Sequence, residues 1–217
     1  NTEAQGFDRL CVPMMIPGND YLIYFQQQIK SSDTKQIIQP RSIRLQHKLQ
    51  YKNSLQLKRL EEVLPDLPAA GESLHLIADG SYDFWRFVPY LVSRLGPADE
   101  CSGSTWIMSR SNIHDLLDLY DRQKIRRVAL LIGLDFKHRK PDIWENLERE
   151  LIRRGQRLKS LAIHAKIILL QAGEQYLTLE GSANFTGNPR IEQFVITNSQ
   201  PLYEFHSGWM ETIFHDQ

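Results

Sequence analysis

Apolar and polar residues alternate in two different patterns along the chain, and the pattern changes near residue 72. From residue 73 onward, short apolar runs typical of strands are followed by longer amphipathic segments typical of helices. The predicted strands cover residues 73–78, 104–109, 126–134, 160–172, 176–182 and 192–198. The predicted helices cover residues 81–96, 111–124, 141–155 and 201–215, with Ser111 or Asn112 capping the second of them.

This order of elements predicts an α/β fold, in which a mostly parallel mixed sheet is flanked by helices. The run "RRVALLIGL" (residues 126–134) is almost wholly apolar, as expected for a strand that is covered on both faces. Pro141 near the start and Gly155 at the end of the segment 141–155 are typical of helix boundaries. We assign residues 73–217 to this single lobe.

The first 72 residues have a different character. A short strand is predicted over residues 21–25, and leucines mixed with long polar side chains predict a helix over residues 41–64. The helix ends at "PDLPAAG", where two prolines and a glycine break the pattern. We interpret residues 1–72 as a helical, basic N-terminal extension.

Composition indicates a soluble globular protein, with 41% hydrophobic residues, 24% charged residues and a net charge of zero. No apolar run reaches the ~20 residues of a membrane helix, so no membrane partner is expected. Cys11 and Cys101 are far apart without metal-ligand spacing, which favours a reducing, cytoplasmic setting. Lys and Arg concentrate in residues 30–59 and 122–159, which predicts a positive face on a neutral protein.

The stretch "HAKIILLQAGEQYLTLEGSANFTGN" (residues 164–188) carries the candidate chemistry. Side chains two apart in a strand point to one face, so His164 and Lys166 are expected to lie together. If the next strand pairs back antiparallel, Ser182 and Asn184 reach the same rim. This set suits a phosphodiester, since a lysine and neutral donors can bind the phosphate oxygens while an imidazole attacks phosphorus. Glu192 would hold the other ring nitrogen.

The ordered set "HAK…EGSANFT…RIEQ" resembles the motif of the phospholipase D superfamily: His-x-Lys, then Gly-Ser-x-Asn and a downstream Glu. The resemblance implies that His164 is the nucleophile or the general acid and that Lys166 binds phosphate. It implies that Ser182 and Asn184 are the polar pair and that Glu192 supports the histidine. The chain departs from the family pattern at Gln171, where the family usually has Asp, and the spacer before Gly181 is longer than usual.

The resemblance also implies a mechanism that needs two histidines, one forming a phosphohistidine and one protonating the leaving oxygen. This chain carries a single copy of the ordered set His-x-Lys, Gly-Ser-x-Asn and Glu. Single-motif members of the family pair two identical chains, so a homodimer with one shared active site is expected. No cofactor is expected, and no metal, because no carboxylates or Cys and His stand at ligand spacing near the motif.

Substrate class is a separate question, since one fold serves several substrates. Arg41, Arg44, Lys48 and Lys52 recur at helical spacing, and Lys137 and Arg139 follow the central strand, so both sets are candidate phosphate-binding residues. Each set also fits a solvated surface. A metal-independent DNA endonuclease is the first hypothesis. The alternatives are a phosphodiesterase acting on a lipid or a small nucleotide, and a non-catalytic nucleic-acid-binding relative, to which Gln171 would point.

Overall fold

The computed structural model describes residues 57–215 except residues 81 and 188. The chain divides into two compact units, residues 1–45 and residues 46–217, and the described residues belong to the second. The predicted strand over residues 21–25 and the four basic residues Arg41, Arg44, Lys48 and Lys52 lie outside the described residues.

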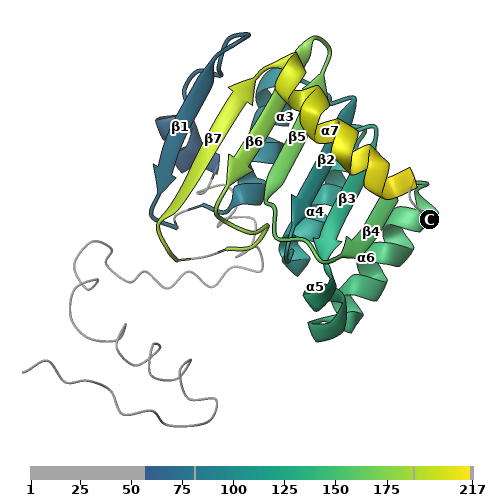
Figure 1. Ribbon diagram of the computed structural model, residues 1–217. Helices are drawn as coiled ribbons and strands as arrows, with labels where there is room; N and C mark the ends of the chain where they lie inside the picture. The colour runs from purple at the N-terminus through teal and green to yellow at the C-terminus, as the bar shows by residue number, and fades with distance from the viewer. Residues whose placement is uncertain (1–56, 81, 188, 216–217) are drawn as a thin grey trace, which may run out of the picture. The chain divides into compact units, whose positions relative to one another are not determined.

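From residue 73 onward, thirteen elements follow one another in the described part of the chain (Figure 1). The strands are β1 (Ser73–Ala78), β2 (Glu100–Thr105), β3 (Val128–Gly133), β4 (Arg157–Leu161), β5 (Ile167–Ala172), β6 (Gln175–Gly181) and β7 (Glu192–Asn198). The helices are η1 (Phe84–Arg86), α3 (Phe87–Leu95), α4 (Arg110–Asp121), α5 (Leu134–Arg139), α6 (Pro141–Arg153) and α7 (Gln200–His215).

The strands form one seven-stranded mixed sheet in the order β1-β7-β6-β5-β2-β3-β4. The α/β fold with a mixed sheet flanked by helices is therefore confirmed, but the expectation of a mostly parallel sheet is wrong. Only β2–β3 and β3–β4 pair in parallel, while β1–β7, β7–β6, β6–β5 and β5–β2 are antiparallel. The reason lies partly in short connections, because β5 turns straight into β6 at Gly173 (φ 58°) and a tight turn can join only antiparallel neighbours.

The sheet separates two apolar layers. The larger core lies against α3, α4 and α6, and includes Phe87, Ile113 and Leu147. The smaller core lies under α7, which crosses the front of the sheet in Figure 1, and includes Leu169 and Met210. β3 is buried along its whole length, which confirms the prediction that both faces of this apolar strand are covered.

The predicted strand over residues 160–172 is in fact two strands. β4 pairs in parallel with β3, the chain then leaves the sheet, and β5 pairs antiparallel with β2 on the other side. The correction matters for function, because His164 and Lys166 lie in the connection between the two strands rather than inside one. The apolar residues Ile163 and Ala165 pack against the smaller core, which is why the connection has the polarity pattern of a strand.

Two other boundaries differ from the prediction. β2 is Glu100–Thr105, so it ends where the predicted strand over residues 104–109 was to begin. The helix predicted over residues 111–124 begins at Arg110 and is capped by Ser109, whose side chain accepts a hydrogen bond from the Asn112 backbone amide. The segment after β3 forms the short helix α5.

The residues before β1 pack on the same core. Residues 57–63 are helical, and Leu60 and Leu64 are buried in the larger core. The hydroxyl of Tyr90 donates a hydrogen bond to the carbonyl of Leu64, and the amide of Gly71 donates to the carbonyl of Asn198. The domain boundary after residue 72 stays a prediction.

Candidate active site

The candidate residues gather at one edge of the sheet. β2, β3 and β4 run in parallel and end there, β5 and β7 begin there, and β6 ends there. His164 follows β4, Lys166 precedes β5, Ser182 follows β6, and Glu192 is the first residue of β7. Strand order thus brings together residues that are up to 28 positions apart in the sequence. The carboxyl ends of parallel strands are where α/β sheets commonly bind ligands.

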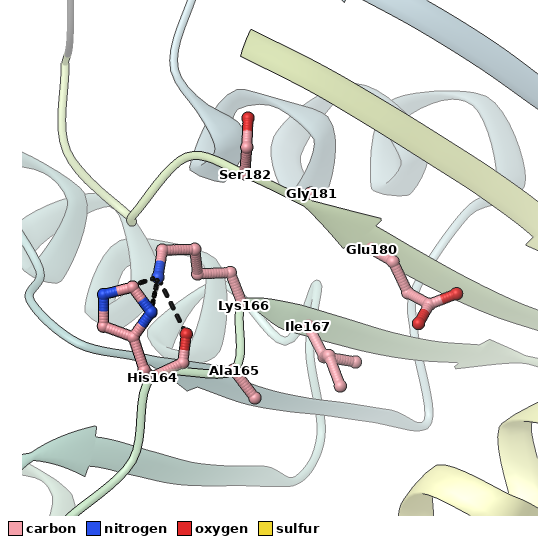
Figure 2. Close-up of a pocket in the computed structure, with 7 residues that line it drawn as sticks. All are labelled: His164, Ala165, Lys166, Ile167, Glu180, Gly181 and Ser182. Carbon is pink, nitrogen blue, oxygen red and sulfur yellow. Dashed lines mark hydrogen bonds between the residues drawn. The ribbon is translucent and has the colours of Figure 1, made fainter.

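Lys166 and His164 are in direct contact. The ammonium nitrogen of Lys166 lies 3.1 Å from Nδ1 and 3.4 Å from Nε2 of His164, and it donates a hydrogen bond of 2.7 Å to the His164 carbonyl oxygen (Figure 2). The His164 side chain is exposed, so a substrate can reach the ring. A cation and an imidazole therefore meet at one point of the surface.

Three successive carbonyl groups hold this turn in place. The carbonyl of His164 accepts from Lys166, and that of Ala165 accepts a 2.8 Å hydrogen bond from the hydroxyl of Ser104. The carbonyl of Lys166 accepts from the amide of Gly181 at 3.2 Å. Ser104 lies in β2 and is fully buried, so its hydrogen bond attaches the turn to the sheet. The sequence prediction overlooked Ser104, because it carries no chemistry of its own.

Ser182 is fixed by the start of β7. Its hydroxyl donates a hydrogen bond to the carboxylate of Glu192 and accepts one of 3.1 Å from the amide of Gln193. The Ser182 amide donates to the carbonyl of Gln193 at 3.1 Å, which continues the β6–β7 pairing past the end of β6. The predicted contact of Glu192 with His164 stays a prediction, while its contact with Ser182 is direct.

Electrostatics link Glu192 to Lys166. Partial burial lowers the pKa of the Lys166 ammonium, and the negative charge of Glu192 works in the opposite direction and raises it. The lysine is therefore a partly desolvated cation, which interacts more strongly with an anion than a fully hydrated one does. Such a cation suits a phosphate.

These side chains line an open pocket of 450 Å³. His164, Ala165, Lys166 and Ile167 form one side, and Glu180, Gly181 and Ser182 form the other (Figure 2). Asn184 is not among the lining residues. Its side-chain oxygen is buried without a hydrogen-bond partner, so its predicted role at the rim stays a prediction. Gln171 lies near the opposite end of β5, so the departure from the family pattern lies outside the pocket.

Lys137 and Arg139 lie in α5, directly after β3. The ammonium of Lys137 lies over the ring of Trp144, 5.2 Å from its centroid. The guanidinium of Arg139 lies over the ring of Trp106 at 5.8 Å, and the Trp106 ring is 5.9 Å from that of His164. Of these two predicted residues, Arg139 is thus the one connected to the site. Trp106 was overlooked because the prediction placed it within a strand.

The described residues show no grouping of three or more His, Cys, Asp or Glu side chains that could hold a metal ion. Over the same part of the chain, no helix has the length and apolar character required to cross a membrane. The cation that the site offers to an anion is Lys166.

No family model and no curated protein matches the chain. The fold is similar to solved structures of low sequence identity, and the three described below have TM-scores below 0.5. Nuc from Salmonella typhimurium, a phospholipase D family member, has a TM-score of 0.47 at 15% identity over 65% of this chain and 93% of that one.

Two larger proteins are similar over part of their length. Phosphatidylserine synthase from Haemophilus influenzae has a TM-score of 0.48 at 10% identity, over 66% of this chain and 38% of that one. Polyphosphate kinase from Porphyromonas gingivalis has a TM-score of 0.46 at 16% identity, over 64% of this chain and 25% of that one. The chain thus spans a quarter to two fifths of these proteins, and its function has to be argued from its own residues.

Proposed function

We propose that this protein is a metal-independent phosphodiesterase in which His164 is the nucleophile and Lys166 binds the phosphate. The observation that carries the proposal is the 3.1 Å contact between the Lys166 ammonium and the His164 ring, at the mouth of a pocket that Ser182 also lines. A non-bridging phosphate oxygen that replaces the ring as partner of Lys166 would lie within reach of the imidazole. The cation would then stabilise the charge that develops on phosphorus.

The reaction has two displacements. A ring nitrogen of neutral His164 attacks phosphorus, a P–N bond forms, the P–O bond to the leaving group breaks, and a general acid protonates the leaving oxygen. Water then attacks the phosphohistidine, the P–N bond breaks, and the proton of the water passes to the base form of the same acid. His164 is regenerated, and no electron acceptor or metal is required.

We propose a homodimer because the reaction needs a general acid in addition to His164. In-line displacement needs the nucleophile and the acid on opposite sides of phosphorus, and this chain has one copy of the ordered set His-x-Lys, Gly-Ser-x-Asn and Glu. The other His-x-Lys tripeptide, residues 138–140, ends α5 and is followed directly by α6. A two-fold axis beside the pocket would place His164 of a second copy on the opposite side. Mixing wild-type and His164→Asn chains tests this proposal. Activity that falls faster than the wild-type fraction supports the shared site, and a strictly proportional fall contradicts it.

DNA is the substrate that we propose. Arg139 is exposed, it belongs to α5 at the same edge of the sheet as the pocket, and it contacts a ring that touches His164. We propose the basic residues Arg41, Arg44, Lys48, Lys52 and Lys137 as further phosphate-binding residues. A lipid or a small nucleotide would need no such further residues.

Plasmid cleavage in excess EDTA tests the function. We expect wild-type protein to cleave, and His164→Asn to remain folded and to lose about 1,000-fold or more of the rate, since a covalent nucleophile has no substitute of similar shape. His75→Asn, which changes an exposed histidine on β1, is the matched control and should keep full activity. Strict dependence on an added divalent ion would contradict the mechanism. Binding without cleavage would favour a non-catalytic relative, and cleavage of a phosphatidyl ester alone would favour a lipid enzyme.

A further inference from the structure

Trp106 follows a buried strand, yet its own side chain is only partly buried. It follows β2 directly, and its ring stays partly exposed beside the ring of His164, with the two centroids 5.9 Å apart. Its indole N–H donates a hydrogen bond of 2.9 Å to the Asp135 carboxylate in α5. The ring is therefore held beside His164 rather than buried in the core.

Gly133 makes this position of Trp106 available. A side chain added at Gly133 would lie 2.5 Å from a carbon of the indole and 2.8 Å from the Trp106 carbonyl oxygen. Both contacts are too close for any other residue, so the last residue of β3 leaves space for the chain that leaves β2. Two strand ends are thus shaped to place one aromatic ring next to His164.

Arg139 completes the arrangement. Its guanidinium lies over the indole ring at 5.8 Å, and its Nε lies 4.0 Å from Asp135, which also accepts from the indole. The Arg139 side chain is 69% exposed. A partly exposed ring with an exposed guanidinium beside it is a surface on which nucleobases stack, because each base has a π-face and is linked to phosphates.

We propose that Trp106 and Arg139 form a subsite that stacks an unpaired nucleobase next to the scissile phosphate. The inference rests on the proposed function, in which His164 attacks that phosphate, and it specifies the substrate further. A base in a continuous duplex is stacked on its neighbours and its faces are covered, so the subsite favours single-stranded nucleic acid or the unpaired part of a duplex. Lipid headgroups carry no aromatic face for this surface.

Binding measured on His164→Asn protein tests the subsite without turnover. The ligands are a short oligothymidylate and a matched oligomer of the same length in which every site is abasic, so that phosphate charge is equal and only the bases differ. We expect the thymidylate to bind about 10-fold more tightly than the abasic oligomer. The same binding measurements are repeated on His164→Ala protein, because the Asn side chain introduced at position 164 could itself contact the ligand.

Fluorescence assigns the effect to one residue. Of the four tryptophans in the chain, Trp85 and Trp144 are 0% and 2% exposed, so bases can reach only Trp106 and Trp209. We expect thymidylate to quench the emission of the protein, the quenching to disappear in Trp106→Leu and to persist in Trp209→Phe. Trp106→Phe keeps an aromatic ring and should retain most of the preference for thymidylate over the abasic oligomer.

Arg139 has a matched control in Arg122. Both are exposed arginines that pair with an aspartate four residues earlier, Asp135 and Asp118 respectively, but Arg122 ends α4 away from the pocket residues. Arg139→Gln should weaken thymidylate binding several-fold and Arg122→Gln should not. Equal affinity for thymidylate and abasic oligomers, or quenching that survives Trp106→Leu, overturns the subsite. A protein that binds in this way but never cleaves would contradict the proposed function and leave the subsite standing.

Discussion

The hydroxyl of Ser182 donates its hydrogen bond to the carboxylate of Glu192 and accepts one from the next amide along β7, that of Gln193. The proton of Ser182 is thus directed toward the protein. Glu192 in turn raises the pKa of Lys166, against the lowering that burial causes. One carboxylate therefore orders the Gly-Ser turn and keeps the neighbouring lysine charged.

Glu192→Gln should move the alkaline limit of activity to lower pH. The amide still accepts a hydrogen bond from Ser182, but it removes the negative charge that favours the charged lysine. The pKa of Lys166, already lowered by burial from 10.5, then falls further, and the phosphate-binding cation is lost at a lower pH. A pH–rate profile of kcat/KM measures this limit. Glu174→Gln, in the exposed turn between β5 and β6, is the control, and an alkaline limit that is unchanged in Glu192→Gln contradicts the link.

Ser104→Ala should reduce activity beyond its effect on stability. It leaves the carbonyl of Ala165, between His164 and Lys166, without the 2.8 Å hydrogen bond that holds the turn. Ser102→Ala is the matched control: it lies in the same strand, is also buried, and loses a 2.8 Å hydrogen bond to Glu100 instead. Urea denaturation should show a loss of about 1–2 kcal/mol for each variant. Only Ser104→Ala should slow cleavage, and equal activity of the two variants would exclude a positioning role.

Acidification should destabilise the fold through His206. This histidine of α7 is 7% exposed, its Nδ1 accepts a 3.1 Å hydrogen bond from Trp209, and Glu180 lies 3.6 Å from its Nε2. Burial lowers its pKa below 6.5, and Glu180 opposes this effect. Below pH 6.5 the unfolded chain therefore takes up a proton before the folded one does, and the free energy of unfolding falls as the pH drops toward the folded pKa.

The variant His206→Gln keeps a hydrogen-bond acceptor for Trp209 and should lose part of this pH dependence. Urea midpoints at pH 7.5 and at about pH 5.5 measure it, with His114→Gln, an exposed histidine on α4, as the control. The difference between the two midpoints should be smaller in His206→Gln than in the control. An equal difference in both variants would mean that His206 does not contribute.

Sequence alone predicted the elements whose signals are local. Pro141 begins α6 and Gly155, with φ 66°, follows its end, as the asymmetry of helix boundaries requires. β1 and β7 match their predicted ranges, Ser73–Ala78 and Glu192–Asn198. The antiparallel return of β6 onto β5, on which the meeting of Ser182 with Lys166 depended, is also confirmed.

β2 was misplaced because its sequence, "ECSGST", is small and polar. The reason for these small residues is tertiary: a side chain at Gly103 would lie 3.0 Å from the ring of Phe185 and 3.2 Å from Leu130. Propensity favoured the aromatic and aliphatic residues that follow, and so placed Trp106 inside a strand. Trp106 lies beside His164 because β2 ends at Thr105. Tertiary packing around β2 determines this end, and local propensity does not report it.

If His164 forms a covalent bond to phosphorus, the phosphohistidine can be trapped before water hydrolyses it. Wild-type protein is mixed with an excess of an oligonucleotide, quenched in denaturant at alkaline pH within the first turnover, digested and analysed by mass spectrometry. We expect a nucleotidyl or phosphoryl adduct on His164, which is lost on acid treatment and is absent in His164→Asn. Multiple turnovers by the wild-type protein with no adduct on His164 at any quench time, or an adduct that persists on another residue of His164→Asn, would contradict it.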